Sequence, residues 1–246
     1  MVFLRSLIFT IIFYFFSFFS CAFYALCSYF IKDQKRFIDL LRNYMKQLHW
    51  LEKVILNIDF EVRGAEHLPK DGLFIVASKH QSSYETMKLH LIFDNPSAVL
   101  KKELFDIPFW GRLAVKSDVI KVDRSSRIKA IRSVREGTKS MIEQKRPIVI
   151  YPQGTRVDVD TTTKDKPYKF GVARMYEDSG LPIIPMAINS GYYYPKKGIT
   201  KRPGKVVFEF LPPIPAGKDP KEMMKELEEI VETASQKLLA EARQTS

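Results

Sequence analysis

A histidine and a glutamate five positions apart, His80 and Glu85, follow the apolar segment Leu73–Ala77. An imidazole can take a proton from a hydroxyl group while a neighbouring carboxylate fixes its tautomer and stabilises the imidazolium. On a regular helix such residues lie about 140° apart, so the pair requires a turn or a helix start. Histidine–acid pairs of this spacing arise easily by chance, and the pattern alone is weak evidence for a general base.

A second segment with possible chemistry is Tyr151–Arg156, which reads Tyr-Pro-Gln-Gly-Thr-Arg and follows an apolar stretch. Proline and glycine favour a tight loop, and Gly154 would let a ligand approach the backbone. The guanidinium of Arg156 could bind a phosphate through two parallel hydrogen bonds. An ordinary turn with a solvated arginine explains the same residues equally well.

Two further cationic positions stand at the ends of apolar segments. Arg124 follows Ile120–Asp123, where it could bind phosphate or pair with an adjacent aspartate. Lys101 begins Lys-Lys-Glu-Leu, and Pro-Phe-Trp-Gly at 108–111 follows shortly after. This lysine could contact an anion and the aromatic pair a lipid chain, although a surface loop with buried aromatics is the simpler interpretation.

The elements that would position these residues alternate between short apolar runs and helix-like stretches. The predicted strands are Leu73–Ala77, Ala98–Leu100, Val119–Val122, Ile148–Tyr151, Ile183–Ile188 and Val206–Phe210. A helix is predicted over Ser125–Gln144, with Ile128, Ile131, Val134, Thr138 and Ile142 on one side, and a closing helix over Lys221–Arg243. This alternation predicts an α/β fold, a sheet flanked by helices, in which ligands bind where the strands end.

The N-terminal region predicts attachment to a membrane. Ser6–Ile31 contains no charged residue, and as a helix it is long enough to cross a hydrocarbon core of about 30 Å or to enter and turn back. Five basic residues follow this run and one precedes it, which would leave the rest of the chain in the cytoplasm. Phe37–Ile58 predicts an amphipathic helix, lying among lipid headgroups or packed on the following domain.

Composition adds a constraint on the partners. The formal net charge is +11, which favours polyanions such as nucleic acid or an acidic membrane surface. No nucleic-acid-binding motif accompanies the membrane segment, so we expect no nucleic-acid partner. The two cysteines, Cys21 and Cys27, both lie inside the apolar run, and no Cys/His spacing predicts a metal site.

Taken together, the segments resemble the lysophosphatidic acid acyltransferases, also called 1-acylglycerol-3-phosphate acyltransferases. That family has a His-x4-Asp block, a Lys-x-Glu-Leu…Pro-x-x-Gly stretch, an arginine-ended strand, a Phe-Pro-Glu-Gly-Thr-Arg loop and a strand containing proline. The same order runs here through His80…Glu85, Lys101…Gly111, Ile120…Arg124, Tyr151…Arg156 and Ile183…Ile188. The likeness covers about residues 58–215, and the whole series is far more specific than any one member.

The resemblance implies a role for each matching residue. It implies that His80 is the base that activates the acceptor hydroxyl and that Glu85 orients it. It implies that the acceptor is held by Arg124 and Arg156 at its phosphate, by Lys101 near the reacting centre, and by the loop of Gln153, Gly154 and Thr155. The implied reaction transfers a fatty acyl group from coenzyme A or acyl carrier protein to 1-acylglycerol 3-phosphate (lysophosphatidic acid), forming phosphatidic acid for phospholipid synthesis without a metal or other cofactor.

Two residues depart from the family pattern. Glu85 stands where aspartate is usual and is one methylene longer, whereas Gln153 replaces a glutamate and removes a charge from the acceptor loop. The second change leaves open an acyltransferase for another lysolipid or an amino-acid lipid. The two changes together leave open a non-catalytic binder of anionic lipid.

The predicted organisation has four parts. These are a membrane anchor over 1–32, an amphipathic helix over 33–57, a catalytic domain over 58–215 and a C-terminal helix over 216–246 that packs on that domain. Contact with membrane phospholipids is expected, at a bacterial inner membrane with the catalytic domain on the cytoplasmic side.

Overall fold

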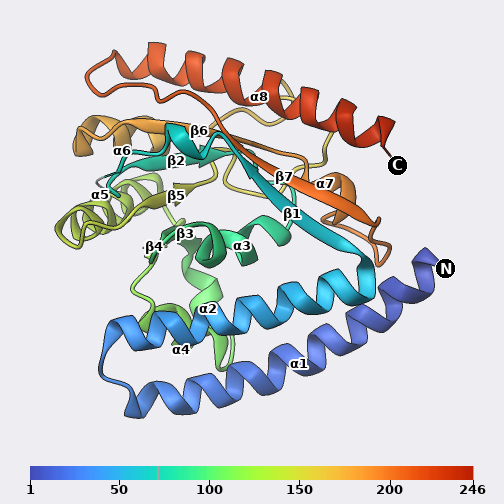
Figure 1. Ribbon diagram of the computed structural model, residues 1–246. Helices are drawn as coiled ribbons and strands as arrows, with labels where there is room; N and C mark the ends of the chain where they lie inside the picture. The colour runs from blue at the N-terminus through green and yellow to red at the C-terminus, as the bar shows by residue number, and fades with distance from the viewer. Residues whose placement is uncertain (71, 246) are drawn as a thin grey trace.

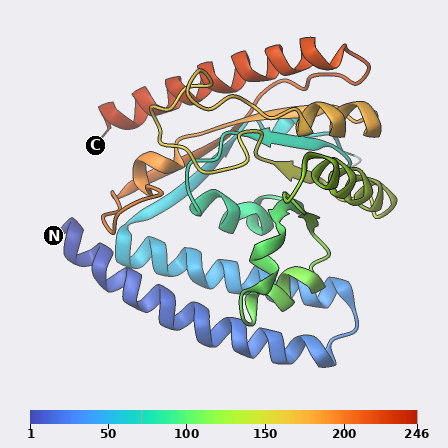
Figure 2. The ribbon, with the colours of Figure 1, turned by 180° about the vertical axis from the view of Figure 1, so that it is seen from behind.

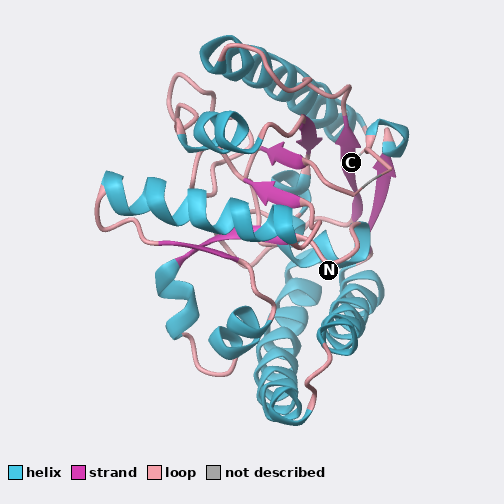
Figure 3. Cartoon of the chain, turned by 90° about the vertical axis from the view of Figure 1, so that its left-hand side faces the viewer, coloured by secondary structure: helices cyan, strands magenta, loops and turns pink. Residues whose placement is uncertain are grey.

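A seven-stranded sheet forms the centre of the computed structural model, which describes residues 1–70 and 72–245 (Figures 1 and 3). Its strand order is β1-β7-β6-β2-β5-β3-β4, and β6 to β4 run parallel while β7 pairs with β6 in the antiparallel sense. The strands are β1 (Ile58–Arg63), β2 (Ile75–Ser78), β3 (Ser97–Lys101), β4 (Ile120–Val122), β5 (Ile148–Ile150), β6 (Ile183–Ile188) and β7 (Gly204–Phe210). The α/β sheet flanked by helices that the sequence predicts is therefore confirmed.

Helices cover both faces of this sheet, with α8 on one side and α3, α2 and α1 on the other (Figures 1 and 2). The helices are α1 (Val2–Phe30), α2 (Gln34–Leu51), α3 (Tyr84–Ile92), α4 (Trp110–Lys116), α5 (Arg127–Glu143), α6 (Gly171–Ser179), α7 (Ser190–Tyr193) and α8 (Pro220–Gln244). Strands buried on both faces need apolar side chains at every position. Strand β2 meets this need, because Ile75 and Ala77 pack in the cluster under α5, α6 and α8, whereas Val76 packs in the opposite cluster.

The N-terminal helix α1 is long and apolar enough to cross a membrane, with a mean hydropathy of 2.0 over its best window. Only 11% of that window is buried, so α1 is not a core helix. Its two ends are nevertheless bound to the domain. Near the start, Arg5 donates to the Ile55 carbonyl at 2.5 Å, and near the end Arg112 donates to the Ser28 hydroxyl at 2.8 Å. Helix α1 therefore lies along the domain instead of standing away from it.

The amphipathic helix predicted over Phe37–Ile58 is α2 followed by one π-helical turn, Glu52–Leu56. Its apolar residues Leu41, Tyr44 and Leu48 are buried in a cluster shared with α1. The sequence left two roles open for α2, lying among lipid headgroups or packing within the protein, and its apolar face packs within the protein.

The predicted strands and helices agree with those observed to within a few residues, but several elements have no counterpart in the prediction. These are β1, α3, α4, α6 and α7. Two positions predicted on the buried side of α5 are exposed, because Ile128 is 81% and Ile131 39% exposed, while Val134 and Thr138 are buried. At about 100° per residue, Ile128 points about 120° away from Val134 around α5, which takes it off the buried face.

A buried ion pair joins the N-terminal helices to α3. The ammonium group of Lys88 on α3 donates to the carboxylate of Glu52 in the π-helical turn, and both side chains are fully buried. The same ammonium lies 4.2 Å from the centroid of the Tyr84 ring. Charges of this kind are tolerated in an interior only when each has a partner.

We expect Lys88→Met to lower the free energy of unfolding by about 3–5 kcal/mol, because it leaves the Glu52 carboxylate buried without a counter-charge. The double variant Glu52→Leu/Lys88→Met should regain most of this loss. Denaturant unfolding in detergent micelles measures both, with Arg132→Ala as control, since Arg132 and Glu136 form an exposed pair. An equal loss in the single and double variants would contradict this explanation.

Candidate active site

The residues that the sequence singles out gather at one edge of the sheet. Strands β2, β5, β3 and β4 are neighbours in this order and run parallel, so their carboxyl ends lie together. His80 follows β2, the loop 151–156 follows β5, Lys101 ends β3, and Arg124 follows β4. The structure thus brings these residues together at this edge.

His80 and Glu85 form a hydrogen-bonded pair. The His80 Nδ1 atom lies 2.8 Å from Glu85 Oε1, and the glutamate is fully buried. A carboxylate oxygen only accepts hydrogen bonds, so Nδ1 donates to it, and the neutral tautomer that this bond favours has its lone pair on Nε2. The imidazole is 18% exposed and lines the cavity described below, as expected for a general base.

The loop around this pair is held by the same carboxylate. Glu85 Oε1 also accepts from the backbone N–H groups of Gln81 at 2.8 Å and Ser82 at 2.7 Å. Its second oxygen accepts from the hydroxyl of Ser190, which follows β6, at 2.7 Å. Glu85 stands in the first turn of α3, so the chain supplies the helix start that the five-residue spacing requires.

Tyr151 fixes the other side of the imidazole. Its ring stacks on His80 with centroids 4.2 Å apart and planes 21° apart. Burial, together with the nearby Glu85 carboxylate, raises the pKa of the Tyr151 phenol well above its ordinary value, so the phenol stays protonated. Stacking on one face and a hydrogen bond at Nδ1 leave the His80 ring little freedom to rotate.

A cavity of about 720 Å³ opens in front of His80. Its walls are largely apolar and come from β3, β4, β5, α5 and α6. The apolar lining residues are Val99, Leu100, Leu104, Val122, Ala130, Ile131, Val134, Ile150, Phe170 and Val172. A space of this size and lining fits an acyl chain.

The charged part of the lining is cationic. Lys101, Arg124 and Arg156 all line the cavity, and so do three cations that sequence reasoning missed, Arg127, Lys169 and Arg174. Among the described lining residues none is aspartate or glutamate. Partial burial, and then the charges of Arg124, Lys166 and Lys101, lower the pKa of Lys169. Uncompensated positive charge around an apolar cavity selects a ligand with an anionic group.

Arg124 does not pair with an adjacent aspartate, which was the alternative to phosphate binding. It donates instead to the Gly154 carbonyl at 2.6 Å, which ties the end of β4 to the loop after β5. Gly154 has a φ of 69°, and an added Cβ would lie 2.9 Å from the Lys169 ammonium nitrogen. Glycine therefore allows both the turn and the approach of Lys169, whose place in space the sequence pattern did not reveal.

The two other residues of the loop differ in position. Thr155 is exposed and lines the cavity. Gln153 is fully buried and is not among the described lining residues, and its amide reaches the Lys166 carbonyl at 3.5 Å. Gln153, which stands where the family motif has glutamate, therefore lies behind the cavity wall.

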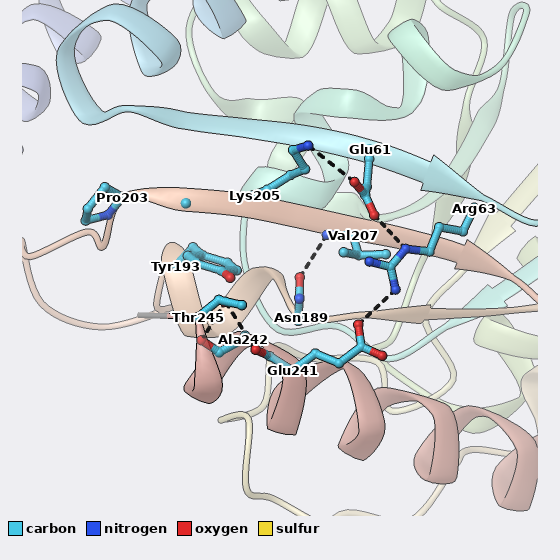
Figure 4. Close-up of a pocket in the computed structure, with 11 residues that line it drawn as sticks. Glu61, Arg63, Asn189, Tyr193, Pro203, Lys205, Val207, Glu241, Ala242 and Thr245 are labelled. Atoms are coloured by element: carbon cyan, nitrogen blue, oxygen red, sulfur yellow. Dashed lines mark hydrogen bonds and ion pairs between the residues drawn. The ribbon is translucent and has the colours of Figure 1, made fainter.

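A second cavity of about 320 Å³ lies between β1, β7 and the end of α8 (Figure 4). Its charged groups pair with one another, because Glu61 contacts both Arg63 and Lys205, and Arg63 also contacts Glu241. It therefore lacks the uncompensated charge found in front of His80. Within residues 1–70 and 72–245, no three His, Cys, Asp or Glu side chains are grouped so that they could hold a metal ion.

Comparison with known proteins shows the family of this chain. A family model described as Acyltransferase matches residues 59–189. The 1-acyl-sn-glycerol-3-phosphate acyltransferase of Pseudomonas aeruginosa is 33% identical over 171 residues, which are 70% of this chain and 65% of that protein. The enzyme of the same name from Saccharomyces cerevisiae is 32% identical over 165 residues, covering 66% and 54%. The chain thus spans less than two thirds of the length of either relative.

The fold is shared with a solved structure, that of the 1-acyl-sn-glycerophosphate acyltransferase from Thermotoga maritima. The two match with a TM-score of 0.75 at 24% identity, covering 97% of this chain and 98% of the other. The matched family region, 59–189, contains the His80–Glu85 pair and all six cationic residues of the described lining. The chain belongs to the acyltransferase family.

Proposed function

We propose that this protein transfers a fatty acyl group from an acyl thioester to the free hydroxyl of 1-acylglycerol 3-phosphate, forming phosphatidic acid. One observation carries the proposal: an oriented imidazole faces an apolar cavity whose described lining holds cations and no carboxylate. Such a cavity suits a molecule that combines an anionic headgroup with a hydrocarbon chain. The names of the relatives support the same acceptor.

The reaction follows from the state of His80. Its Nε2 takes the proton from the acceptor hydroxyl as the oxygen attacks the thioester carbonyl. The Glu85 carboxylate stabilises the imidazolium that forms. When the tetrahedral intermediate collapses, the carbon–sulfur bond breaks and the leaving thiolate takes the proton from His80. The ester and the free thiol are the products, and His80 returns to its starting state.

The acceptor phosphate is held, in this proposal, by Arg124, Arg156, Lys101 and Lys169. The guanidinium of Arg124 is already oriented by its bond to Gly154 at 2.6 Å, so little of its freedom is lost on binding. The acyl donor is a thioester of coenzyme A or of acyl carrier protein, which are both anionic and suit a cationic rim.

Membrane association places this site beside its lipid substrate. Because both ends of α1 are bound to the domain, we propose that α1 enters the membrane by its exposed apolar face while the domain rests on the surface. Phe15, Phe19 and Phe23 are among the apolar residues exposed on α1. The cytoplasmic side of a bacterial inner membrane remains our expectation, since thioester donors are cytosolic.

The structure bears on the alternative of a different acceptor. That alternative rested on Gln153, but its side chain is buried and does not reach the described cavity lining. The non-catalytic alternative requires a disabled base, whereas His80 and Glu85 lie at 2.8 Å in working geometry. Lysophosphatidic acid therefore remains the acceptor that the site supports best.

The proposed activity is tested with purified protein in detergent micelles, labelled 1-acylglycerol 3-phosphate and acyl coenzyme A or acyl–acyl carrier protein. Wild type should form labelled phosphatidic acid, and His80→Ala should lower turnover by about 10²–10⁴-fold because the base is lost. His67→Ala is a suitable control, since this histidine lies in a distant 3₁₀ turn, Ala65–His67. Equal product from wild type and His80→Ala would exclude His80 as the base, and a preference for phosphate-free acceptors would refute the proposed substrate.

Lys169→Met should raise the KM for the acceptor by about tenfold with a smaller effect on kcat, because one charge–phosphate contact is worth about 1.5–3 kcal/mol at most. The matched control is Lys166→Met, which removes an equal charge three residues away but from outside the described cavity lining. Steady-state kinetics at varied acceptor concentration measures both. Equal KM values for the two variants would mean that general charge, rather than contact by Lys169, attracts the acceptor.

A further inference from the structure

Lys79, the residue before His80, is buried although it carries a charge. Its side chain is 2% exposed, and its ammonium group donates to the Thr161 carbonyl at 2.6 Å and to Glu232 Oε2 at 2.8 Å. Glu232 lies on α8, and its side chain is 13% exposed. This buried ion pair thus joins the strand-end loop that carries His80 to the C-terminal helix.

The same glutamate contacts a second segment of the active site. Glu232 Oε1 accepts from the Tyr168 hydroxyl at 3.4 Å, and Tyr168 directly precedes Lys169. Thr161, which accepts from Lys79, belongs to the same connection between β5 and α6. The Glu232 carboxylate and its lysine partner therefore contact both the loop of the base and the loop of the phosphate-binding cations.

These two loops also touch directly at the reacting centre. The backbone N–H of Val157 donates to the His80 carbonyl at 2.7 Å, one residue beyond Arg156. The N–H of Lys169 donates to the Pro152 carbonyl at 2.9 Å, which closes the β5–α6 connection on itself. A displacement of Lys79 would therefore displace His80, and through the bond to Val157 it would also displace the loop that carries Arg156.

Helix α8 does not need this ion pair to stay in place. Met223, Leu227 and Val231 are fully buried against the sheet, and α8 covers the sheet along its length (Figure 1). Buried ion pairs add little net stability compared with apolar residues of similar volume. Since packing holds α8 and the charges cost desolvation, the pair has a use other than stability.

We propose that Lys79 and Glu232 are positioning residues, which fix the loop of His80 against the loop of Arg156 and Lys169 from the side of α8. The catalytic effect rests on the acyltransferase activity proposed above. Glu232 lies outside the matched family region, 59–189, so the C-terminal helix would complete the active site from beyond that region.

The test compares two double variants of α8 ion pairs. Lys79→Met/Glu232→Met removes the proposed positioning pair and keeps the side-chain volume. Lys218→Met/Glu226→Met removes another lysine–glutamate pair of α8, which lies at 2.6 Å near the start of the helix and is more exposed. For each protein we would measure kcat, acceptor KM, the thermal unfolding midpoint and hydrogen exchange of the segments 79–85 and 157–168.

We expect Lys79→Met/Glu232→Met to keep a wild-type unfolding midpoint, yet to lose about 10–100-fold in kcat and to raise the acceptor KM, because small displacements of reacting groups are costly. Amide exchange should become faster in both segments of this variant. The control pair should leave all four quantities unchanged. Should the double variant not fold, Lys79→Gln/Glu232→Gln, which removes both charges but keeps hydrogen-bonding groups, should show the same changes to a smaller degree.

Wild-type kcat, KM and exchange in Lys79→Met/Glu232→Met would overturn the proposal. A loss of activity that matches a loss of stability, and that equals the loss in the control pair, would also overturn it, because a purely structural role predicts that result. If wild type forms no phosphatidic acid, the proposed function fails, but the exchange measurement still decides whether Lys79 and Glu232 position the two loops.

Discussion

A single buried carboxylate organises the catalytic edge of the sheet. Glu85 is removed from solvent, so its oxygens must find their hydrogen-bond donors within the protein. These donors are His80, the two backbone N–H groups that follow it, and Ser190 after the neighbouring strand β6. Satisfying this one group bends the chain after β2, starts α3 and fixes the tautomer of the base.

The rest of the structure supplies the cavity in which His80 acts in the proposed function. Parallel strands bring Lys101, Arg124 and the loop after β5 to the same edge, and α5 and α6 complete an apolar cavity. The cavity thus combines a hydrocarbon-compatible space with positive charge, as a phosphate-bearing lipid requires. On the opposite face, α1 and α2 connect this site to a surface that suits a membrane, and the buried Lys88–Glu52 pair joins them to the helix of Glu85.

The amount that could be predicted from sequence differs between the fold and the site. Central strands such as Ile183–Ile188 are apolar throughout and short, so their prediction was accurate. Helix α3 was missed because its residues show no amphipathic period: Glu85 and Lys88 are polar, yet buried, Lys88 by its pair with Glu52 far along the chain. For the same reason Lys169 and Glu232 were not singled out from the sequence, since no local pattern reveals a contact over tens of residues. Gln153 shows the converse, a residue whose motif position predicts contact with the ligand but whose side chain packs behind the wall.

The central claim is that a charged carboxylate at position 85 makes His80 a base. It is tested most directly by comparing kcat for Glu85→Asp and Glu85→Gln with that of wild type, each variant first being shown to fold. Aspartate keeps the charge, so we expect its kcat to stay within about tenfold of wild type. Glutamine keeps the size but cannot stabilise the imidazolium, and its kcat should fall by about 10³-fold or more. Equal kcat values for the two variants would contradict the account and remove Glu85 from the mechanism.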